Sequence, residues 1–291
     1  MRRLRNNDEV IQICELYQTG LTTRQVAEKV GRSQAYVAKL VLLNGLSRTH
    51  SESNGMQRPN PSIIDRTRTR TRAHAVNESY FDVIDTEPKA YWLGFLLADG
   101  YISQENRVLG ILLAPKDTDH IERFRQAIGS THPVTTGTAG GYERSMIQIG
   151  SVALVKSLAA HGVIARKTGT AKWPTTVPFG LLRHFLRGYS DGNGSFTTTM
   201  YKGRKVPKLT WALYAHEAIL ISAQNFLVSV FGLPRTKLSK NRSSKDSFGL
   251  FYSGAENAHK IYHLLYDGAT SWLPRKRDII EKWMREYGSP K

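Results

Sequence analysis

Apolar residues recur at helical spacing in three short runs near the N-terminus, and turn signals separate the runs. Residues 8–17 form the first predicted helix. A capping box over Thr22–Gln25 begins a second helix, which ends at Gly31, and Ser33 caps a third helix over residues 34–43. The apolar positions are Val10, Cys14 and Tyr17 in the first helix, Val26 and Val30 in the second, and Val37, Leu40 and Val41 in the third.

The second and third predicted helices have the spacing of a known DNA-binding unit. Ala27 is small enough to let the two helices approach, Gly31 supplies the turn, and Val37 anchors the third helix. Residues 8–46 therefore resemble a helix-turn-helix domain, as found in resolvases and many repressors. The resemblance implies that the third helix enters a major groove. Arg32 would then flank the DNA backbone, and the residues facing the bases would be Ser33, Gln34, Ala38 and Lys39. A plain three-helix packing unit remains the alternative.

The composition changes to that of a linker over residues 49–79, after a first domain of residues 1–48. Prolines at positions 59 and 61 block regular structure, and residues 66–72 alternate arginine with threonine without an apolar face. The linker is either a solvated tether or a strand that contacts the DNA backbone or a narrow minor groove through Arg68 and Arg70.

From Tyr80 onward the pattern predicts the same order of elements twice: helix, two strands, helix, two strands, helix. The two repeats are residues 80–176, the first half, and residues 177–291, the second half, which also holds a terminal helix over residues 277–287. Further elements expected in the first half are strands near 108–113, 132–136 and 142–149 and helices over 117–128 and 151–160. Those of the second half are strands near 195–200, 206–214, 236–239 and 248–252 and helices over 217–231 and 255–266.

The helices that open the two halves share a pattern of small residues. Gly94 and Ala98 lie four residues apart in the first, as Gly188 and Gly192 do in the second, so each helix offers a flat strip to another backbone. Asp99 and Asn193 follow at equivalent helix C-termini. A carboxylate at the negative end of a helix dipole is unfavourable unless a nearby cation compensates its charge, and a bound divalent metal would be such a cation.

Charge indicates a polyanionic partner. The 291 residues include 41 Lys and Arg against 24 Asp and Glu, a formal net charge of +17, which favours nucleic acid. No apolar run approaches the roughly 20 residues of a spanning helix, so we expect a cytoplasmic protein without a membrane partner. Cys14 is the only cysteine, which excludes an internal disulfide and a zinc cluster and leaves oxygen ligands for any metal.

Residues 80–285 strongly resemble the LAGLIDADG homing endonucleases that carry the motif twice in one chain. The resemblance rests on Tyr91-Trp-Leu-Gly-Phe-Leu-Leu-Ala-Asp-Gly-Tyr101 and His184-Phe-Leu-Arg-Gly-Tyr-Ser-Asp-Gly-Asn-Gly-Ser-Phe196. It implies an α+β fold in which two αββαββα halves, related by a pseudo-twofold axis, form saddle-shaped antiparallel sheets behind the small all-α helix-turn-helix domain. It also implies a monomer that hydrolyses phosphodiester bonds in double-stranded DNA at a specific site.

By the same resemblance, Asp99 and Asn193 are the catalytic and metal-binding positions, with Mg²⁺ as the expected cofactor and Mn²⁺ also suited to oxygen ligands. A catalytic lysine near each site would be Lys167 or Lys276, each of which follows the last helix of its repeat. Asn193 departs from the family, which usually has an acid there, because an amide brings no negative charge. We expect asymmetric cleavage; nicking of one strand and loss of cleavage are the other outcomes.

DNA contacts are expected from basic residues in the strand regions, interleaved with Ser, Thr and Asn. The candidates in the second half are Lys202, Arg204, Lys205, Lys208, Arg235, Lys237, Lys240 and Arg242. The alternative function is a catalytically inactive DNA- or RNA-binding protein on the same scaffold, either a transcription regulator or an intron maturase. Asn193 and the helix-turn-helix favour that alternative, whereas Asp99 and the two lysines favour the enzyme.

Overall fold

A computed structural model describes residues 7–44, 46, 73–167, 169–240 and 247–288. The chain forms two compact units that divide between Ala73 and His74, and each is considered by itself. Three predicted DNA contacts, Arg68, Arg70 and Arg242, lie outside the described residues.

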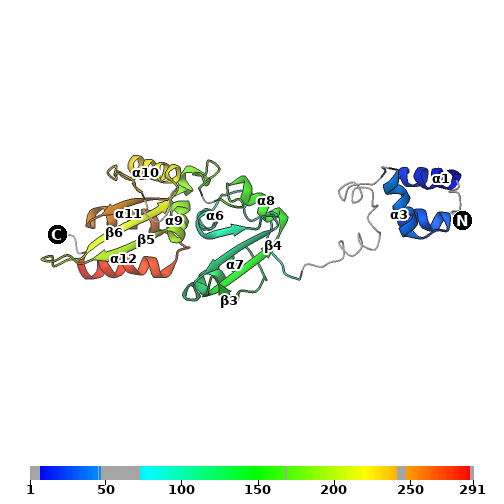
Figure 1. Cartoon of the computed structure of the whole chain (residues 1–291). Coiled ribbons are helices and arrows are strands. Elements are labelled where there is room, and N and C mark those ends of the chain that lie inside the picture. The colour runs from blue at the N-terminus through cyan, green and yellow to red at the C-terminus, as the bar shows by residue number, and fades with distance from the viewer. Residues whose placement is uncertain (1–6, 45, 47–72, 168, 241–246, 289–291) are drawn as a thin grey trace. The chain divides into compact units, whose positions relative to one another are not determined.

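The N-terminal unit contains the three predicted helices, α1 (Asn7–Gln18), α2 (Thr23–Val30) and α3 (Gln34–Leu43) (Figure 1). The capping box at Thr22 is formed in both directions, and Gly31 ends α2 with a left-handed φ of 64°. The face of α1 differs from the prediction in one respect. Ile13 is fully buried in the core of this unit, while Cys14 is only half-buried.

The larger unit holds two four-stranded antiparallel sheets, with strand orders β1-β2-β4-β3 and β5-β6-β8-β7 (Figure 1). The first half contains α6 (Glu87–Asp99), β1 (Gly100–Ile102), β2 (Val108–Leu113), η1 (Pro115–Asp117), α7 (Thr118–Ala127), β3 (Thr135–Ala139), β4 (Tyr142–Gly150) and α8 (Val152–Ala160). The second half contains η2 (Phe179–Leu181), α9 (Leu182–Asn193), β5 (Gly194–Thr199), β6 (Lys208–Ala215), α10 (Glu217–Phe231), β7 (Ser239–Lys240), β8 (Phe248–Ser253), α11 (Ala255–Tyr266) and α12 (Pro274–Tyr287). The predicted α+β class with a duplicated αββαββα order is confirmed.

Each sheet has one apolar and one more polar face, because successive residues of a strand point to opposite sides. Ile111 and Ile147 are register partners in the first sheet, and Trp211 and Tyr252 in the second; all four are buried in one shared core. The exposed Gln148 and Thr197 belong to the opposite faces. The larger unit therefore keeps a polar face on each sheet that is open to a partner.

The linker predicted for residues 49–79 ends earlier than expected. The backbone of Ala75 pairs with that of Thr131, and the Asn77 N–H donates to the Ile128 carbonyl at 2.9 Å. These bonds make residues 75–77 part of the larger unit. The local sequence lacks an apolar run there, which is why it reads as linker.

None of the described helices is long and apolar enough to cross a membrane.

Candidate active site

The C-termini of α6 and α9 meet because glycine lets the two helices touch backbone to backbone (Figure 1). A Cβ built on Gly94 would lie 2.0 Å from the Phe185 carbonyl oxygen, and one on Gly188 would lie 1.9 Å from that of Tyr91. A Cβ on Gly192 would lie 2.3 Å from the Cβ of Ala98. The predicted strips of small residues therefore face each other, and they bring the two motif ends together.

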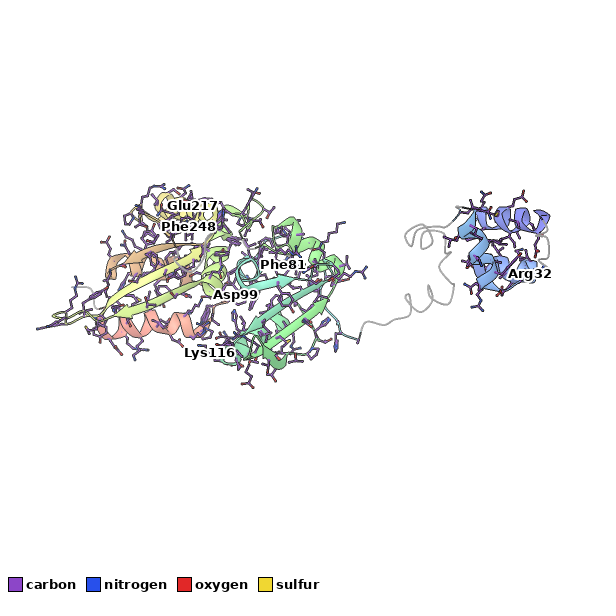
Figure 2. The ribbon with its side chains drawn as sticks, in the orientation of Figure 1. Arg32, Phe81, Asp99, Lys116, Glu217 and Phe248 are labelled. Atoms are coloured by element: carbon purple, nitrogen blue, oxygen red, sulfur yellow. The ribbon has the colours of Figure 1, made fainter. Side chains whose placement is uncertain are left out.

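Asp99 is the last residue of α6 and lies where the two halves meet (Figure 2); its side chain is exposed. Protein atoms surround the carboxyl on its other sides, and this desolvation raises its pKa. Lys276, Lys167 and Arg275 act in the opposite direction and lower the pKa, with Lys276 having the largest effect of the three. Asp99 is thus an accessible carboxyl surrounded by cations.

The two predicted lysines occupy equivalent places at the motif ends. The Lys167 ammonium donates to the carbonyl of Gly100, the residue after Asp99. The Lys276 ammonium donates to the carbonyl of Gly194, the residue after Asn193, at 2.6 Å. Burial lowers the pKa of both ammonium groups, that of Lys276 to about 8. The pseudo-twofold arrangement therefore extends from the helices to the lysines.

Lys276 is held far more tightly than Lys167. Its side chain is only 6% exposed, whereas Lys167 is half-buried. The Lys276 ammonium also donates to the carbonyls of Ser190 and Gly192, each at 3.2 Å, and to that of Asp191. A cation at these last carbonyls of α9 stabilises the negative end of the helix dipole.

Asn193 ends α9 as predicted, and its side chain is half-buried. Its amide Nδ2 donates a long hydrogen bond of 3.4 Å to the Tyr189 hydroxyl. A cavity of about 340 Å³ lies beside it, lined by Lys167, Tyr214 and His216 among others. Asn193 thus contributes a neutral amide at the place where Asp99 contributes a carboxyl in the first half.

The donors at this seam suit Mg²⁺ better than a metal that needs a complete protein cage. In the described part of the chain, no group of three or more His, Cys, Asp or Glu residues is arranged to hold a metal. Mg²⁺ keeps several water ligands and is commonly bound by one or two carboxylates together with substrate phosphates. Asp99 offers an exposed carboxyl and Asn193 an amide oxygen at the ends of two helices in contact, so these two residues could each give such an ion a protein ligand.

Asp191, the carboxylate nearest to Asn193 in the sequence, points into the protein. It is 1% exposed, and its Oδ2 accepts hydrogen bonds from the Tyr91 hydroxyl at 2.8 Å and the Leu273 N–H at 2.7 Å. Burial raises its pKa to about 6. Asp191 is therefore turned away from the surface, as its angular position on α9 relative to Asn193 predicts.

A buried ion pair beside the seam was not anticipated from the sequence. Arg187 of α9 is fully buried and pairs with Glu87 of α6; it also donates to the carbonyls of Leu265 and Ser271, each at 2.7 Å. An arginine among the small and apolar residues of the motif was the available signal. This ion pair connects α9 of the second half to the start of α6 in the first half.

The predicted DNA contacts of the second half differ in availability. Lys202, Arg204 and Lys205 are exposed in the β5–β6 connection, Lys208 is half-buried on β6, and Lys237 and Lys240 are exposed. Arg235 instead donates to Gln224 and Asn225 of α10, at 3.3 and 2.8 Å. Much of its hydrogen-bonding capacity is therefore used within the protein.

In the N-terminal unit the predicted DNA contacts are exposed, but several have partners. Arg32 forms an ion pair with Glu9. Ser33 caps α3 by accepting from the Tyr36 N–H, and Gln34 donates to Thr23. Lys39 is exposed on α3. A DNA complex would have to compete with these contacts or use the remaining donors.

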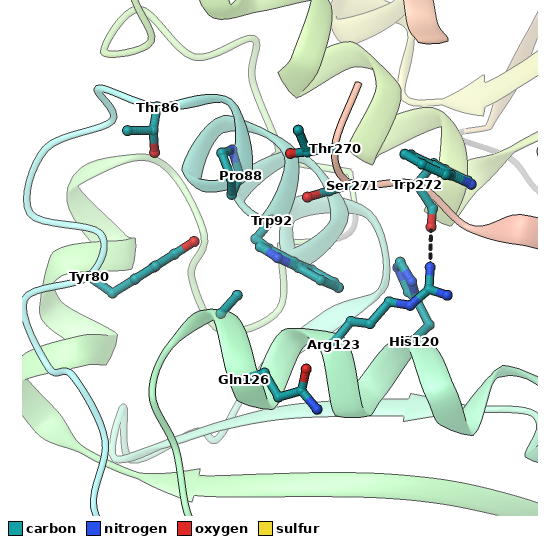
Figure 3. Close-up of a pocket in the computed structure, with 11 residues that line it drawn as sticks. Tyr80, Thr86, Pro88, Trp92, His120, Arg123, Gln126, Thr270, Ser271 and Trp272 are labelled. Atoms are coloured by element: carbon teal, nitrogen blue, oxygen red, sulfur yellow. Dashed lines mark hydrogen bonds between the residues drawn. The ribbon is translucent and has the colours of Figure 1, made fainter. Parts of the chain in front are cut away.

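A larger cavity lies beside the N-terminal part of α6, and Asp99 does not line it. It measures about 600 Å³ and is lined by residues of the N-terminal part of α6, of α7 and of the segment before α12, including Trp92, His120, Arg123 and Trp272 (Figure 3). None of the predicted catalytic residues lines it. Volume alone therefore does not locate the candidate site, whereas the charged groups at the helix ends do.

The solved structures that resemble this chain are LAGLIDADG homing endonucleases. The I-AabMI meganuclease bound to uncleaved DNA is 13% identical, covers 68% of this chain and 89% of its own, and gives a TM-score of 0.47. The I-SmaMI homing endonuclease bound to cleaved DNA is 13% identical over 70% and 89%, with a TM-score of 0.46. I-CpaMI bound to uncleaved DNA is 12% identical over 69% and 90%, with a TM-score of 0.47. No protein-family model and no curated protein sequence matches the chain.

Proposed function

We propose that the chain is a site-specific endonuclease of the LAGLIDADG homing type, which hydrolyses double-stranded DNA with a divalent metal. The observation that carries the proposal is the exposed Asp99 carboxyl at the seam of α6 and α9, with the ammonium groups of Lys167 and Lys276 bound next to the two motif ends. A carboxyl surrounded by lysines is suited to holding a metal against a phosphate.

In the proposed reaction, Asp99 and Asn193 would each hold a divalent metal ion through a side-chain oxygen, one at each motif end. The chemistry that such a metal supplies is polarisation of the phosphate and a lower pKa of an attacking water. Lys167 and Lys276 stabilise the negative charge that develops on the phosphate oxygens. The polar sheet faces and the basic β5–β6 connection bind the DNA on either side.

The two halves should cleave their DNA strands at different rates. Asp99 brings a negative charge to the metal and Asn193 does not, so hard divalent cations bind more weakly on the second side. We therefore expect one strand to be cut faster than the other. Equal rates on both strands would contradict this asymmetry.

A second candidate is a DNA- or RNA-binding protein that does not cleave, such as a regulator or a maturase. Two observations favour it: Asn193 is neutral, and the Lys276 ammonium is already bound by backbone carbonyls.

Both candidates predict tight, salt-sensitive binding, so cleavage decides between them. The substrates are supercoiled DNAs that carry the sequence flanking the gene or the intron-less form of its insertion locus, which cover a freestanding and an intron-encoded gene. We expect nicked and then linear product with Mg²⁺ and none with EDTA. Binding without product in Mg²⁺ or Mn²⁺ would support the second candidate.

A further inference from the structure

The segment 270–276, which leads from α11 into α12, belongs to the second half but is bound by the first half along its length. The Glu87 carboxylate of α6 accepts from the N–H groups of Thr270 and Ser271, each at 3.2 Å. Arg123 of α7 donates to the carbonyl of Trp272 (Figure 3). The segment is therefore positioned by contacts between the two halves, and it ends at Lys276.

Two further contacts hold the end of the segment that carries Lys276. Asp117, which precedes α7 and is 5% exposed, accepts from the Arg275 guanidinium at 2.8 and 3.0 Å. Asp191 accepts from the Leu273 N–H at 2.7 Å. Leu273 is the N-cap residue of α12, so its N–H has no partner within that helix and depends on Asp191.

Asp191 also connects this helix start to the opposite half. Its Oδ2 accepts a second hydrogen bond from the hydroxyl of Tyr91, a fully buried residue of α6, at 2.8 Å. On the other side, the Asp191 carbonyl accepts from the Lys276 ammonium. One residue thus fixes both the backbone that carries Lys276 and part of the cradle for its ammonium group.

Among the described residues of the first half, this arrangement has no counterpart at the equivalent motif position. The motif position equivalent to Asp191 is Leu97, whose side chain cannot accept a hydrogen bond. This difference agrees with the exposure of the two lysines, since Lys276 is 6% exposed and Lys167 is half-buried.

We propose that Asp191 is a positioning residue that, with Tyr91, sets the place of the Lys276 ammonium beside Asp99. The proposal rests on the endonuclease function in so far as Lys276 contributes to cleavage, but the positioning itself is a property of the fold. Asp191 acts through the acceptor oxygen of its side chain. Asparagine keeps such an oxygen and alanine does not, so the two replacements separate this role from others.

The first experiment needs no cleavage. Reductive methylation of the full chain, followed by mass spectrometry, measures the reactivity of Lys276 against Lys167 as an internal reference. We expect Asp191→Ala to raise the relative reactivity of Lys276 about tenfold, and Asp191→Asn to raise it less than about twofold, because a side chain that loses its buried contacts becomes accessible. Leu220→Ala, in the core of the same half, is the control for general destabilisation and should leave the ratio unchanged.

The second experiment tests the consequence for cleavage. Single-turnover rates should fall about a hundredfold in Asp191→Ala, with unchanged DNA affinity and substantial rescue in Asp191→Asn. In a Lys276→Met background, Asp191→Ala should cause no further loss, because the effect passes through Lys276.

Unchanged Lys276 reactivity in Asp191→Ala, or equal reactivity gains in the alanine and asparagine variants, would overturn the proposal. If the methylation results hold but the wild-type chain cleaves no DNA, the positioning role stands and the endonuclease function fails.

Discussion

Replacing Gly188 with alanine should separate the two motif helices and damage both stability and cleavage. The new Cβ would lie 1.9 Å from the Tyr91 carbonyl oxygen, 2.8 Å from the Tyr91 carbonyl carbon and 2.9 Å from the Phe95 nitrogen. All three are backbone atoms that cannot rotate away. The helices must therefore move apart by at least about 1 Å to relieve the overlap.

Two opposing effects determine the expected change in the free energy of unfolding. Overpacking against backbone costs about 3 kcal/mol, at the upper end of the usual range. Alanine in place of glycine inside a helix stabilises the folded state by about 1 kcal/mol. We therefore expect a net loss of about 2 kcal/mol in the free energy of unfolding of the larger unit. A displacement of about 1 Å between Asp99 and the lysines should also lower the cleavage rate about a hundredfold.

Tryptophan fluorescence during urea unfolding measures this directly, because all five tryptophans belong to the larger unit. Gly180→Ala is the matched control, since a Cβ there meets nothing within 4 Å, and its stability should stay within about 0.5 kcal/mol of wild type. If Gly188→Ala proves as stable as Gly180→Ala and cleaves normally, the close helix contact is wrong.

Three other predictions concern asymmetry, domain roles and pH. Asn193→Asp should speed cleavage of the slower strand about tenfold or more, because it adds negative charge at the second metal position. In a plasmid assay it should convert nicked circles to linear DNA. An unchanged ratio of the two strands' cleavage rates would show that Asn193 is not limiting. Removing residues 1–73 should weaken or shift the preference for the target site in binding and cleavage assays, while the larger unit stays folded around its own core. If a folded truncation loses all cleavage, the two units do not have separate roles. Burial lowers the pKa of His120 to about 3. Between about pH 6.5 and 3 the unfolded state therefore binds more protons than the folded state. The free energy of unfolding should fall as the pH falls through that window, by up to about 1.4 kcal/mol per pH unit. His120→Phe should lose this part of the slope in urea titrations at pH 7, 5.5 and 4.5; identical slopes in both proteins would contradict the assignment.

The order of helices and strands was predictable because burial follows the local period of the sequence. Leu209 and Trp211 are buried and alternate with the half-buried Lys208 and Thr210 on β6, and Val37 and Leu40 recur at helical spacing on α3. The strand β1 was counted in the predicted order but not placed, because its three residues directly continue the motif helix and are too few to show a period. The start of the larger unit was placed too late for a similar reason, since backbone pairing at Ala75 leaves no pattern in side chains.

The candidate site was predictable only in part. Repetition of small residues before Asp99 and Asn193 was enough to predict that two helix ends meet. The two lysines were proposed from the family resemblance, and their positions in the repeat only selected the candidates. The supports were not predictable, because they join residues distant in the chain: Arg187 with Glu87, and Asp191 with Leu273. Such pairs depend on how the two halves pack, and a single sequence does not encode that packing in any local pattern.

The most direct test of the account is strand cleavage by Asp99→Asn compared with wild type and with Asp85→Asn, on supercoiled DNA that carries the intron-less insertion locus, in Mg²⁺. Asp85 pairs with Lys89 at the surface, so its replacement removes one charge without touching the seam of α6 and α9. The account predicts that wild type and Asp85→Asn yield nicked and linear DNA, whereas Asp99→Asn binds the same DNA and yields neither. Cleavage by Asp99→Asn at the wild-type rate would contradict the central role of this carboxyl.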